Sequence, residues 1–327
     1  MYSLTESNIG KYKTLRVVNE NSGEYLEILS DFGASINDFK INLNNSLTSV
    51  IDGYKTPQEI KDFHLTTFKG SKLSPYSNRI KNGQYTFNNI FYQMDINFPS
   101  ENHSIHGLLH NRSFEISETK LTEYEAIIAL DNKYCGDESG YPFKYSISIR
   151  YLFKDLTVSC ESIVQNLSDT AIPIGDGWHP YFTTGTPVDS LYLRMPSKLL
   201  VDIDKNNMIP NGEFLPYNKF IKMNNISDRF LDNCFSVKSA NVLFRTSLFD
   251  PIKNVMIKVW NETGYRKYNY IHLYTPPHRK SIAIEPTSSP PNSFNSEIDL
   301  IVLRPKEKIS LSWGIEIEKD KYIMGIN

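Results

Sequence analysis

Apolar residues recur at every second position along most of this chain, and this period restricts the possible fold more than any other feature. The clearest examples are the segments 146–153, 191–195, 255–260 and 309–317, in which apolar side chains alternate with polar or small ones. A period of two is the pattern of a strand with one buried face. Clusters of Asn, Gly, Pro and Asp separate these segments, as expected for turns. The pattern predicts an all-β protein.

Helical signals are scarce. The segment TPQEIKDF, residues 56–63, has Thr56 as a helix N-cap, Pro57 at the first helical position and Glu59 in the place of a capping box. We expect one or two helical turns there, within a loop. No linker, low-complexity tract or short repeat divides the chain. Residues 1–327 are therefore expected to form a single domain, a large antiparallel β-sandwich.

Composition argues against several classes of partner. Lys and Arg number 35 against 37 Asp and Glu, which leaves no basic surface for nucleic acid. No apolar run approaches the roughly 20 residues that cross a bilayer, so no membrane partner is expected. The first residues lack the apolar core of a signal peptide, which predicts a cytoplasmic protein. Cys135, Cys160 and Cys234 show neither metal-type nor disulfide spacing, and Cys160 fits a buried strand position.

Two polar stretches in the first third of the chain carry candidate site residues. In SPYSNRIKNGQY, residues 74–85, Asn78 and Arg79 precede a turn at Asn82-Gly83. An arginine before a hairpin is more often simply solvated. In residues 102–114, three histidines and an arginine lie close together, among them His106. This density permits metal binding, but the stretch offers no evident acidic or thiol partners, and we expect no metal.

Two further stretches lie later in the chain. In GDGWHPYF, residues 175–182, His179 stands between Trp178 and Pro180, neighbours that would hold its ring direction. A core histidine is the simpler interpretation, but a fixed imidazole also suits a proton donor. In IAIEP, residues 282–286, alternation puts Glu285 on the face opposite Ile282 and Ile284. If that face lines a cleft, burial would raise the pKa of Glu285 toward that of a useful base.

Together these residues predict a site made of one Glu, one or two His and an Arg, without a cofactor. The sequence has no G-x-G-x-x-G, Walker-type, G-x-S-x-G or H-E-x-x-H motif. A carboxylate that removes a hydroxyl proton, and an imidazole that delivers one to another oxygen, suit acid–base catalysis on a neutral polyol.

The same stretches resemble the aldose 1-epimerase (galactose mutarotase) family, in the family's order. The resemblance rests on Asn-Arg-Ile at 78–80 with Gly83 and Tyr85, His106-Gly107, HPYF at 179–182, LYTPP at 273–277, Glu285-Pro286 and PPNSFN at 290–295. Residues 25–41 also resemble the family's first hairpin. The resemblance implies the galactose mutarotase-like supersandwich, with a sugar in an open groove on one sheet.

The resemblance also implies roles. Glu285 would be the general base at the anomeric hydroxyl, and His179 the general acid at the ring oxygen. His106 would hydrogen-bond the ring oxygen or a neighbouring hydroxyl, Arg79 would hold the sugar, and Asn78 would lie beside it. Asp232, in the short match FLDNCF, takes the place of a sugar-binding aspartate. The implied partner is a monosaccharide such as galactose or glucose, with the protein a monomer or homodimer.

Departures from the family keep other functions open. Leu108-Leu109-His110-Asn111-Arg112 replaces a common Gly and later Trp, and the family pattern does not explain His110 and Arg112. Surface positions are the simpler interpretation of both. With Arg79 they would instead suit a phosphate, which would make the protein a hexose-6-phosphate 1-epimerase. A non-catalytic sugar-binding protein and a glycoside hydrolase, with Asp232 as second carboxylate, are the remaining alternatives.

Overall fold

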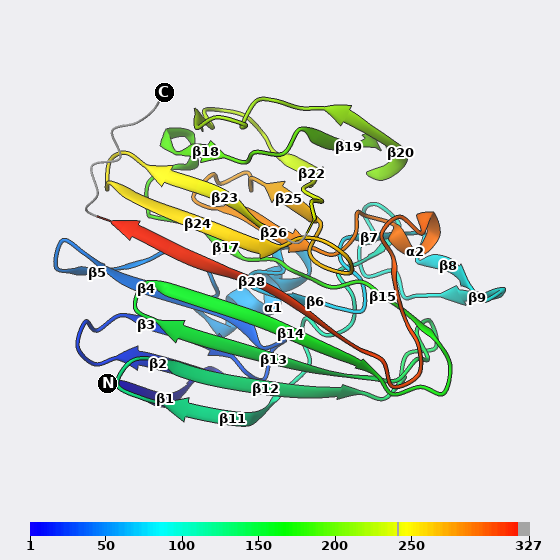
Figure 1. Cartoon of the computed structure of the whole chain (residues 1–327), viewed down its shortest axis with the longest axis horizontal. Helices are drawn as coiled ribbons and strands as arrows, with labels where there is room; N and C mark the ends of the chain where they lie inside the picture. Colours follow the sequence, from blue (N-terminus) through cyan, green and yellow to red (C-terminus); the bar gives the residue numbers. More distant parts are fainter. Residues whose placement is uncertain (241, 320–327) are drawn as a thin grey trace.

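A computed structural model describes residues 1–240 and 242–319, and antiparallel sheets dominate it (Figure 1). The largest sheet has nine strands in the order β11-β12-β13-β14-β28-β24-β23-β18-β21. Their bounds are β11 Glu115–Leu121, β12 Ala126–Tyr134, β13 Tyr145–Lys154, β14 Thr157–Asn166, β28 Lys308–Lys319, β24 Val255–Glu262, β23 Leu243–Asp250, β18 Tyr192–Arg194 and β21 Asn224–Asn225. The prediction of an all-β antiparallel fold is confirmed.

Two further sheets complete the main layers. The eight-stranded sheet comprises β20 Ile209–Pro216, β19 Leu199–Asp204, β22 Asp232–Ser236, β25 Tyr270–Tyr274, β26 Ile282–Thr287, β16 Gly177–Trp178 and β6 Lys72–Leu73, with β17 Tyr181–Phe182 also paired to β26. The five-stranded sheet comprises β1 Tyr2–Ile9, β2 Tyr12–Asn19, β3 Tyr25–Leu29, β4 Ser35–Leu43 and β5 Ser46–Ser49. Small two-stranded sheets pair β7 Arg79–Lys81 with β10 His103–Ile105, β8 Gln84–Phe87 with β9 Ile90–Gln93, and β15 Ile172–Ile174 with β27 Ile301–Leu303.

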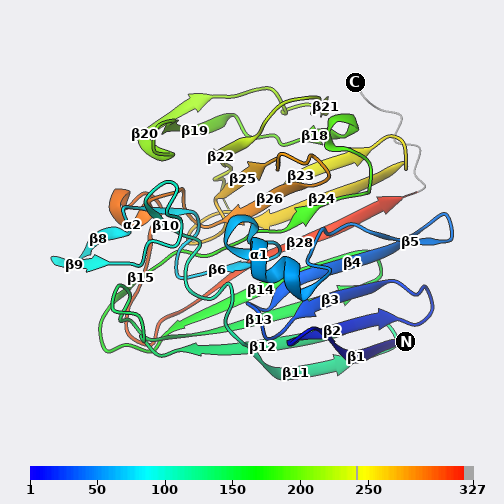
Figure 2. The same ribbon diagram turned by 180° about the vertical axis from the view of Figure 1, so that it is seen from behind.

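The five-stranded and eight-stranded sheets pack on the same face of the nine-stranded sheet, as the two opposite views show (Figures 1 and 2). Phe39 of β4 meets Phe153 of β13 with ring centroids 5.6 Å apart, and Trp178 of β16 meets Trp313 of β28 at 5.9 Å. The alternation in β13 is the cause: Ile147, Ile149, Tyr151 and Phe153 are all buried, while the residues between them face away. Cys160 of β14 is buried in the same layer, as predicted.

Helix α1, Pro57–Thr67, is longer than the predicted one or two turns. The Thr56 hydroxyl accepts a hydrogen bond from the Glu59 amide at 3.1 Å, as the capping box requires, and Glu59 itself accepts from the Lys55 amide at 2.8 Å. The helix continues because Ile60 and His64, four residues apart, are both buried beneath it. The apolar pattern of the sequence does not include His64, because histidine is polar, so the predicted helical segment ended too early. Two short helical segments, η1 Val188–Ser190 and α2 Ser293–Ser296, lie elsewhere.

In the part of the chain that the structure describes, helices are too short or too polar to cross a membrane.

Candidate active site

The six side chains that the resemblance assigns to a sugar site all line one cavity. The cavity measures about 210 Å³ and is bordered by Asn78, Arg79, His106, His179, Asp232 and Glu285, together with several aromatic residues. Pockets for drug-sized ligands occupy roughly 300–1,000 Å³, so this one suits a smaller molecule. The six residues come from segments more than 200 positions apart, which the eight-stranded sheet and the β7–β10 pair bring together.

Glu285 lies in the middle of the eight-stranded sheet, on strand β26. Its neighbours Ile282 and Ile284 point into the main core, and Glu285 takes the opposite face, as the alternation predicts. It is 2% exposed. Burial raises its pKa to about 8, against the opposing effect of the His272 imidazole nearby. The carboxyl group therefore holds a proton far more readily than an ordinary glutamate.

His179 faces Glu285 from the short turn between β16 and β17. Its Nε2 lies 3.4 Å from Oε1 of Glu285, and its ring stacks on Tyr181 with centroids 4.9 Å apart. Backbone bonds hold the turn: the His179 amide donates to Ser71 at 3.1 Å, and its carbonyl accepts from Gly70 at 2.9 Å. Burial lowers the pKa of His179 to about 3, aided by the charge of His272. The imidazole is fixed in direction and resists protonation.

His106 lies beside His179, with ring centroids 5.1 Å apart. Its Nδ1 accepts the amide hydrogen of Asn78 at 3.3 Å, and its own amide donates to the Asn78 carbonyl at 2.9 Å. In the neutral ring the proton therefore sits on Nε2. Burial and the charges of His179 and Arg79 hold the pKa of His106 well below its usual value. Gly107 follows with φ +74°, and a Cβ there would stand 2.3 Å from the Ser74 carbonyl oxygen.

Arg79 is buried rather than solvated, at 7% exposure. Its guanidinium donates two hydrogen bonds to the Glu101 carboxylate, one from Nε and one from Nη2. The Nη2 atom lies 3.0 Å from Oε1. Nη1 donates to Oδ1 of Asn78 at 3.0 Å. Such a two-point contact fixes the plane of the guanidinium as well as its charge. Arg79 and Asn78 thus form one rigid edge of the cavity.

Asp232 faces the cavity from β22 and is held by His272 of β25. His272 Nε2 lies 2.8 Å from Asp232 Oδ1. Burial alone would raise the pKa of Asp232, but this bond and the imidazole charge outweigh burial and lower it. Asp232 is therefore an ionised hydrogen-bond acceptor next to the Glu285–His179 pair.

Sequence inspection missed several residues of the cavity. They are Glu101 and His272, the aromatic residues Phe68, Phe98, Tyr181, Phe230 and Tyr274, and also Thr66 and Ile105. His272 had a detectable signal: it stands in YIHLY, an alternating segment that runs into LYTPP, and a hairpin with residues 282–287 would bring it opposite Glu285. Glu101 had none, since its partner Arg79 lies 22 positions away across a loop.

His110 and Arg112 lie outside this cavity. His110 Nδ1 contacts His64 Nε2 at 2.7 Å, and Arg112 pairs with Asp137 at 2.7 Å. Both border a separate hollow of about 260 Å³. His110 is buried, so the expectation of a surface position was wrong for it, because the predicted helical turns ended before His64, the residue of α1 that contacts His110.

The dense histidine segment does not converge on one point. His103 Nε2 donates to the Asn207 carbonyl at 2.8 Å, while His106 and His110 point to different cavities. Within residues 1–240 and 242–319, no group of three His, Cys, Asp or Glu side chains is arranged to hold a metal ion.

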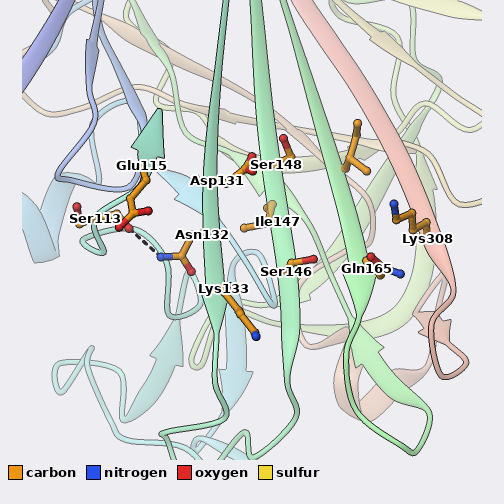
Figure 3. Close-up of a pocket in the computed structure, with 11 residues that line it drawn as sticks. Ser113, Glu115, Asp131, Asn132, Lys133, Ser146, Ile147, Ser148, Gln165 and Lys308 are labelled. Carbon is orange, nitrogen blue, oxygen red and sulfur yellow. Dashed lines mark hydrogen bonds between the residues drawn. The ribbon is translucent and has the colours of Figure 1, made fainter. Parts of the chain in front are cut away.

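A larger depression, about 570 Å³, lies on the solvent-facing side of β12, β13, β14 and β28 (Figure 3). Its lining, as far as the structure describes the chain, is Ser, Asn, Gln, Lys, Asp, Glu and Ile without a histidine. Asn132 donates to the Ser113 carbonyl at 2.8 Å there. This described lining therefore holds no carboxyl group buried against an imidazole, which is the pair that the smaller cavity contains.

Comparison with known proteins gives one family match over most of the chain. A family model described as aldose 1-epimerase matches residues 16–316. The uncharacterised Escherichia coli protein YihR is 32% identical over 266 residues, covering 79% of this chain and 81% of that protein. The bifunctional protein GAL10 of Kluyveromyces lactis is 29% identical, covering 72% of this chain but only 36% of its own length.

Solved structures share the fold at low identity. A galactose mutarotase-like protein from Clostridium acetobutylicum superposes with a TM-score of 0.84 at 20% identity, covering 97% of this chain and 98% of that one. A galactose 1-epimerase from Lactobacillus acidophilus gives 0.78 at 16% identity, with 98% and 99% coverage. At such identities the agreement concerns the fold, and it confirms the predicted mutarotase-like sandwich.

Proposed function

The chain belongs to the aldose 1-epimerase family, and from this premise we propose that it interconverts the α and β anomers of a free aldohexose. The observation that carries the proposal is the buried contact of 3.4 Å between His179 Nε2 and Glu285 Oε1, both of which line the small cavity. Anomer exchange requires a proton to leave one oxygen and another to arrive at a second oxygen. A base and an acid in contact, facing one small ligand, meet that requirement.

The proton steps balance without any other reactant. In ring opening, the Glu285 carboxylate takes the proton of the anomeric hydroxyl while protonated His179 gives one to the ring oxygen, so the C1–O5 bond breaks and an aldehyde forms. Rotation about C1–C2 then exposes the other face of the carbonyl. In closure, neutral His179 takes the proton of the C5 hydroxyl, and the Glu285 carboxyl group gives its proton to the carbonyl oxygen.

The acid–base pair carries a single proton in either state. Burial favours the uncharged forms, raising the pKa of Glu285 to about 8 and lowering that of His179 to about 3. The free enzyme near neutral pH thus has protonated Glu285 and neutral His179, which is the state needed for closure. The opening state differs by transfer of that one proton, so both directions use the same total charge.

Charge balance in the cavity favours a neutral sugar. Arg79 is already neutralised by Glu101, and Asp232 by His272. A phosphate would need uncommitted cations. Arg112, the cation that a hexose-6-phosphate epimerase would use here, instead pairs with Asp137 outside the cavity. These contacts support the unphosphorylated substrate over the phosphorylated one.

The test is polarimetry of freshly dissolved α-D-glucose and α-D-galactose with four proteins: wild type, Glu285→Gln, His179→Asn and Glu118→Gln. Loss of an acid or base typically slows a reaction about 10²–10⁴-fold, and we expect that loss in the first two variants. Glu118→Gln is the matched control, because Glu118 is exposed on β11. It should relax the rotation as fast as wild type.

The outcomes separate the alternatives. Acceleration by wild type and the control alone supports the proposal. Acceleration of glucose 6-phosphate but neither free sugar would assign the phosphorylated substrate. No acceleration of any aldose, with sugar binding still measurable by calorimetry, would make the protein a sugar-binding member of the fold. Full turnover by Glu285→Gln would remove that residue from the mechanism.

A further inference from the structure

His272 is the charged group of the cavity to which neither the sequence nor the proton steps above assign a role. It lies on β25 directly opposite Glu285 of β26 in the strand register. It lines the same cavity and is 7% exposed. Cross-strand partners of this kind have Cβ atoms about 4.5–5.5 Å apart. Its ring therefore stands beside the base as part of the sheet, not on a movable loop.

The second contact of His272 is with Asp232. Its Nε2 donates to Oδ1 at 2.8 Å, while Nδ1 is buried and makes no hydrogen bond among the described residues. The groups around the ring therefore decide whether it is neutral or protonated. Burial disfavours the imidazolium, but the bond to Asp232 and the neighbouring Cys234 and Glu285 outweigh it and raise the pKa of His272 to about 10.

We propose that His272 is a positioning residue of this site: it holds Asp232 in place for a sugar hydroxyl and, as a fixed cation beside Glu285, sets the pH above which the acid–base pair loses its proton. The inference rests on the proposed anomer exchange. His272 affects the reaction indirectly, through its hydrogen bond to Asp232 and its charge beside Glu285.

His272 is the residue that pairs with Glu285 across the neighbouring strand. The ionisable groups on the elements packed around it are His272 and Tyr274 on β25, Asp232 and Cys234 on β22, Tyr181 on β17, His179 before β17 and Arg79 on β7. Arg79 is bound by Glu101, and Asp232 is bound by His272 itself. Of the groups that lower the pKa of Glu285, the His272 imidazole ranks ahead of Arg79.

The hydrogen bond to Asp232 also bears on selectivity. One carboxylate oxygen is used by His272, so the other is left to accept from a ligand hydroxyl in a fixed direction. A site built to bond a particular hydroxyl rejects an analogue that lacks it, because the buried acceptor would then be unpaired. Loss of the positioning of Asp232 should therefore raise KM. Loss of the positive charge beside Glu285 should shift the pH profile of kcat/KM.

The first test compares kcat/KM from pH 5 to 10 for wild type, His272→Gln and His278→Gln. Glutamine can still donate to Asp232 but carries no charge. Removing a neighbouring cation makes the pair hold its proton more tightly, so the alkaline fall in kcat/KM should move upward by about 1 pH unit in His272→Gln. His278 is exposed and lies outside the cavity, so His278→Gln should reproduce the wild-type profile.

The second test does not depend on turnover. The chain has seven histidines, so ¹⁵N-histidine labelling gives a small set of imidazole signals, and the one lost in His272→Gln is assigned. That ring should stay protonated above pH 8 in wild type and titrate near neutral pH in Asp232→Asn. The carboxyl carbon of Glu285, assigned by its loss in Glu285→Gln, should titrate about 1 pH unit higher in His272→Gln than in wild type.

The two tests distinguish a failure of the proposed reaction from a failure of the positioning role of His272. If wild type accelerates no anomer exchange but the NMR titrations behave as expected, the proposed reaction fails while the charge relation of His272, Asp232 and Glu285 stands. If His272 titrates near an ordinary pKa of about 6.5, or Glu285 titrates identically in His272→Gln, the positioning role is overturned whatever the activity. A His272→Gln variant that keeps the wild-type pH profile would overturn it as well.

Discussion

At the scale of single residues, the most unusual group outside the cavity is a buried pair of histidines. His64 Nδ1 meets the Tyr54 hydroxyl at 2.8 Å, and His64 Nε2 meets His110 Nδ1 at 2.7 Å. One hydrogen lies in each contact when both rings are neutral. Burial lowers the pKa of His64 to about 2 and that of His110 to about 4. Protonation of both rings would leave two N–H donors facing each other, Nε2 of His64 and Nδ1 of His110.

This pair makes stability dependent on acid. The pKa of His64 in the folded protein lies below its value of roughly 6.5 in the unfolded chain. Below pH 6.5 the unfolded chain therefore binds a proton that the folded protein does not bind, and the free energy of unfolding decreases as the pH falls. From pH 6.5 to 5, one such histidine removes about 2 kcal/mol, at about 1.36 kcal/mol per pH unit. Urea unfolding of wild type and His64→Gln at both pH values should show the smaller loss in the variant. Parallel losses would contradict the assignment.

At the scale of elements, the cavity depends on a few tight backbone crossings. The segment that carries His106 passes directly over Ser74, and Gly107 makes this possible because it has no Cβ. The same crossing includes the amide of Leu108, which donates to the Ser74 carbonyl at 2.7 Å. The His-Gly pair noted in the sequence is thus a positional requirement: the glycine lets the histidine approach Asn78.

Gly107→Ala should therefore impair both folding and activity. The new methyl would meet the Ser74 carbonyl at 2.3 Å, so the His106 segment must move. Gly23→Ala is the matched control, because Gly23 has φ +72° against +74° for Gly107 but no atom within 4 Å of the position that a Cβ would take. Positive φ alone costs about 1 kcal/mol or more in both. Unfolding and polarimetry should show a larger destabilisation and a slower reaction only for Gly107→Ala; equal effects would mean the crossing tolerates a methyl group.

At the scale of the whole molecule, one hydrophobic core runs from Tyr2 to Ile317 and joins all three main sheets. The C-terminal strand β28 lies between β14 and β24, so it binds the middle of the chain to the last third. No segment keeps a large core of its own apart from small satellite clusters in the described residues. We therefore propose that residues 1–327 are one domain.

A single domain should unfold as one cooperative unit. In scanning calorimetry we expect one transition whose calorimetric and van't Hoff enthalpies agree. Two resolved transitions, or a protease fragment from the five-stranded sheet that leaves a folded remainder, would show that this sheet is an independent unit.

The strands and the order of the motifs could be predicted from the sequence, because each depends on residues that are close together in the chain. Alternation at 146–153 is enforced by the pleat of the backbone and needs no knowledge of partners. The motifs around Asn78, His106, His179 and Glu285 carried enough local pattern to suggest a family. The structure brings all four to one cavity.

Pairings across long stretches of chain were decided only by the fold. His272 faces Asp232 across 40 positions, Arg79 meets Glu101 across 22, and His110 meets His64 across 46. A sequence records which groups can form such bonds, but many partners are chemically equivalent before strand register and loop path select one. Some of the cavity's residues could therefore be identified from the sequence alone. Their charge states could not, because these depend on burial and on neighbours that exist only in the folded protein.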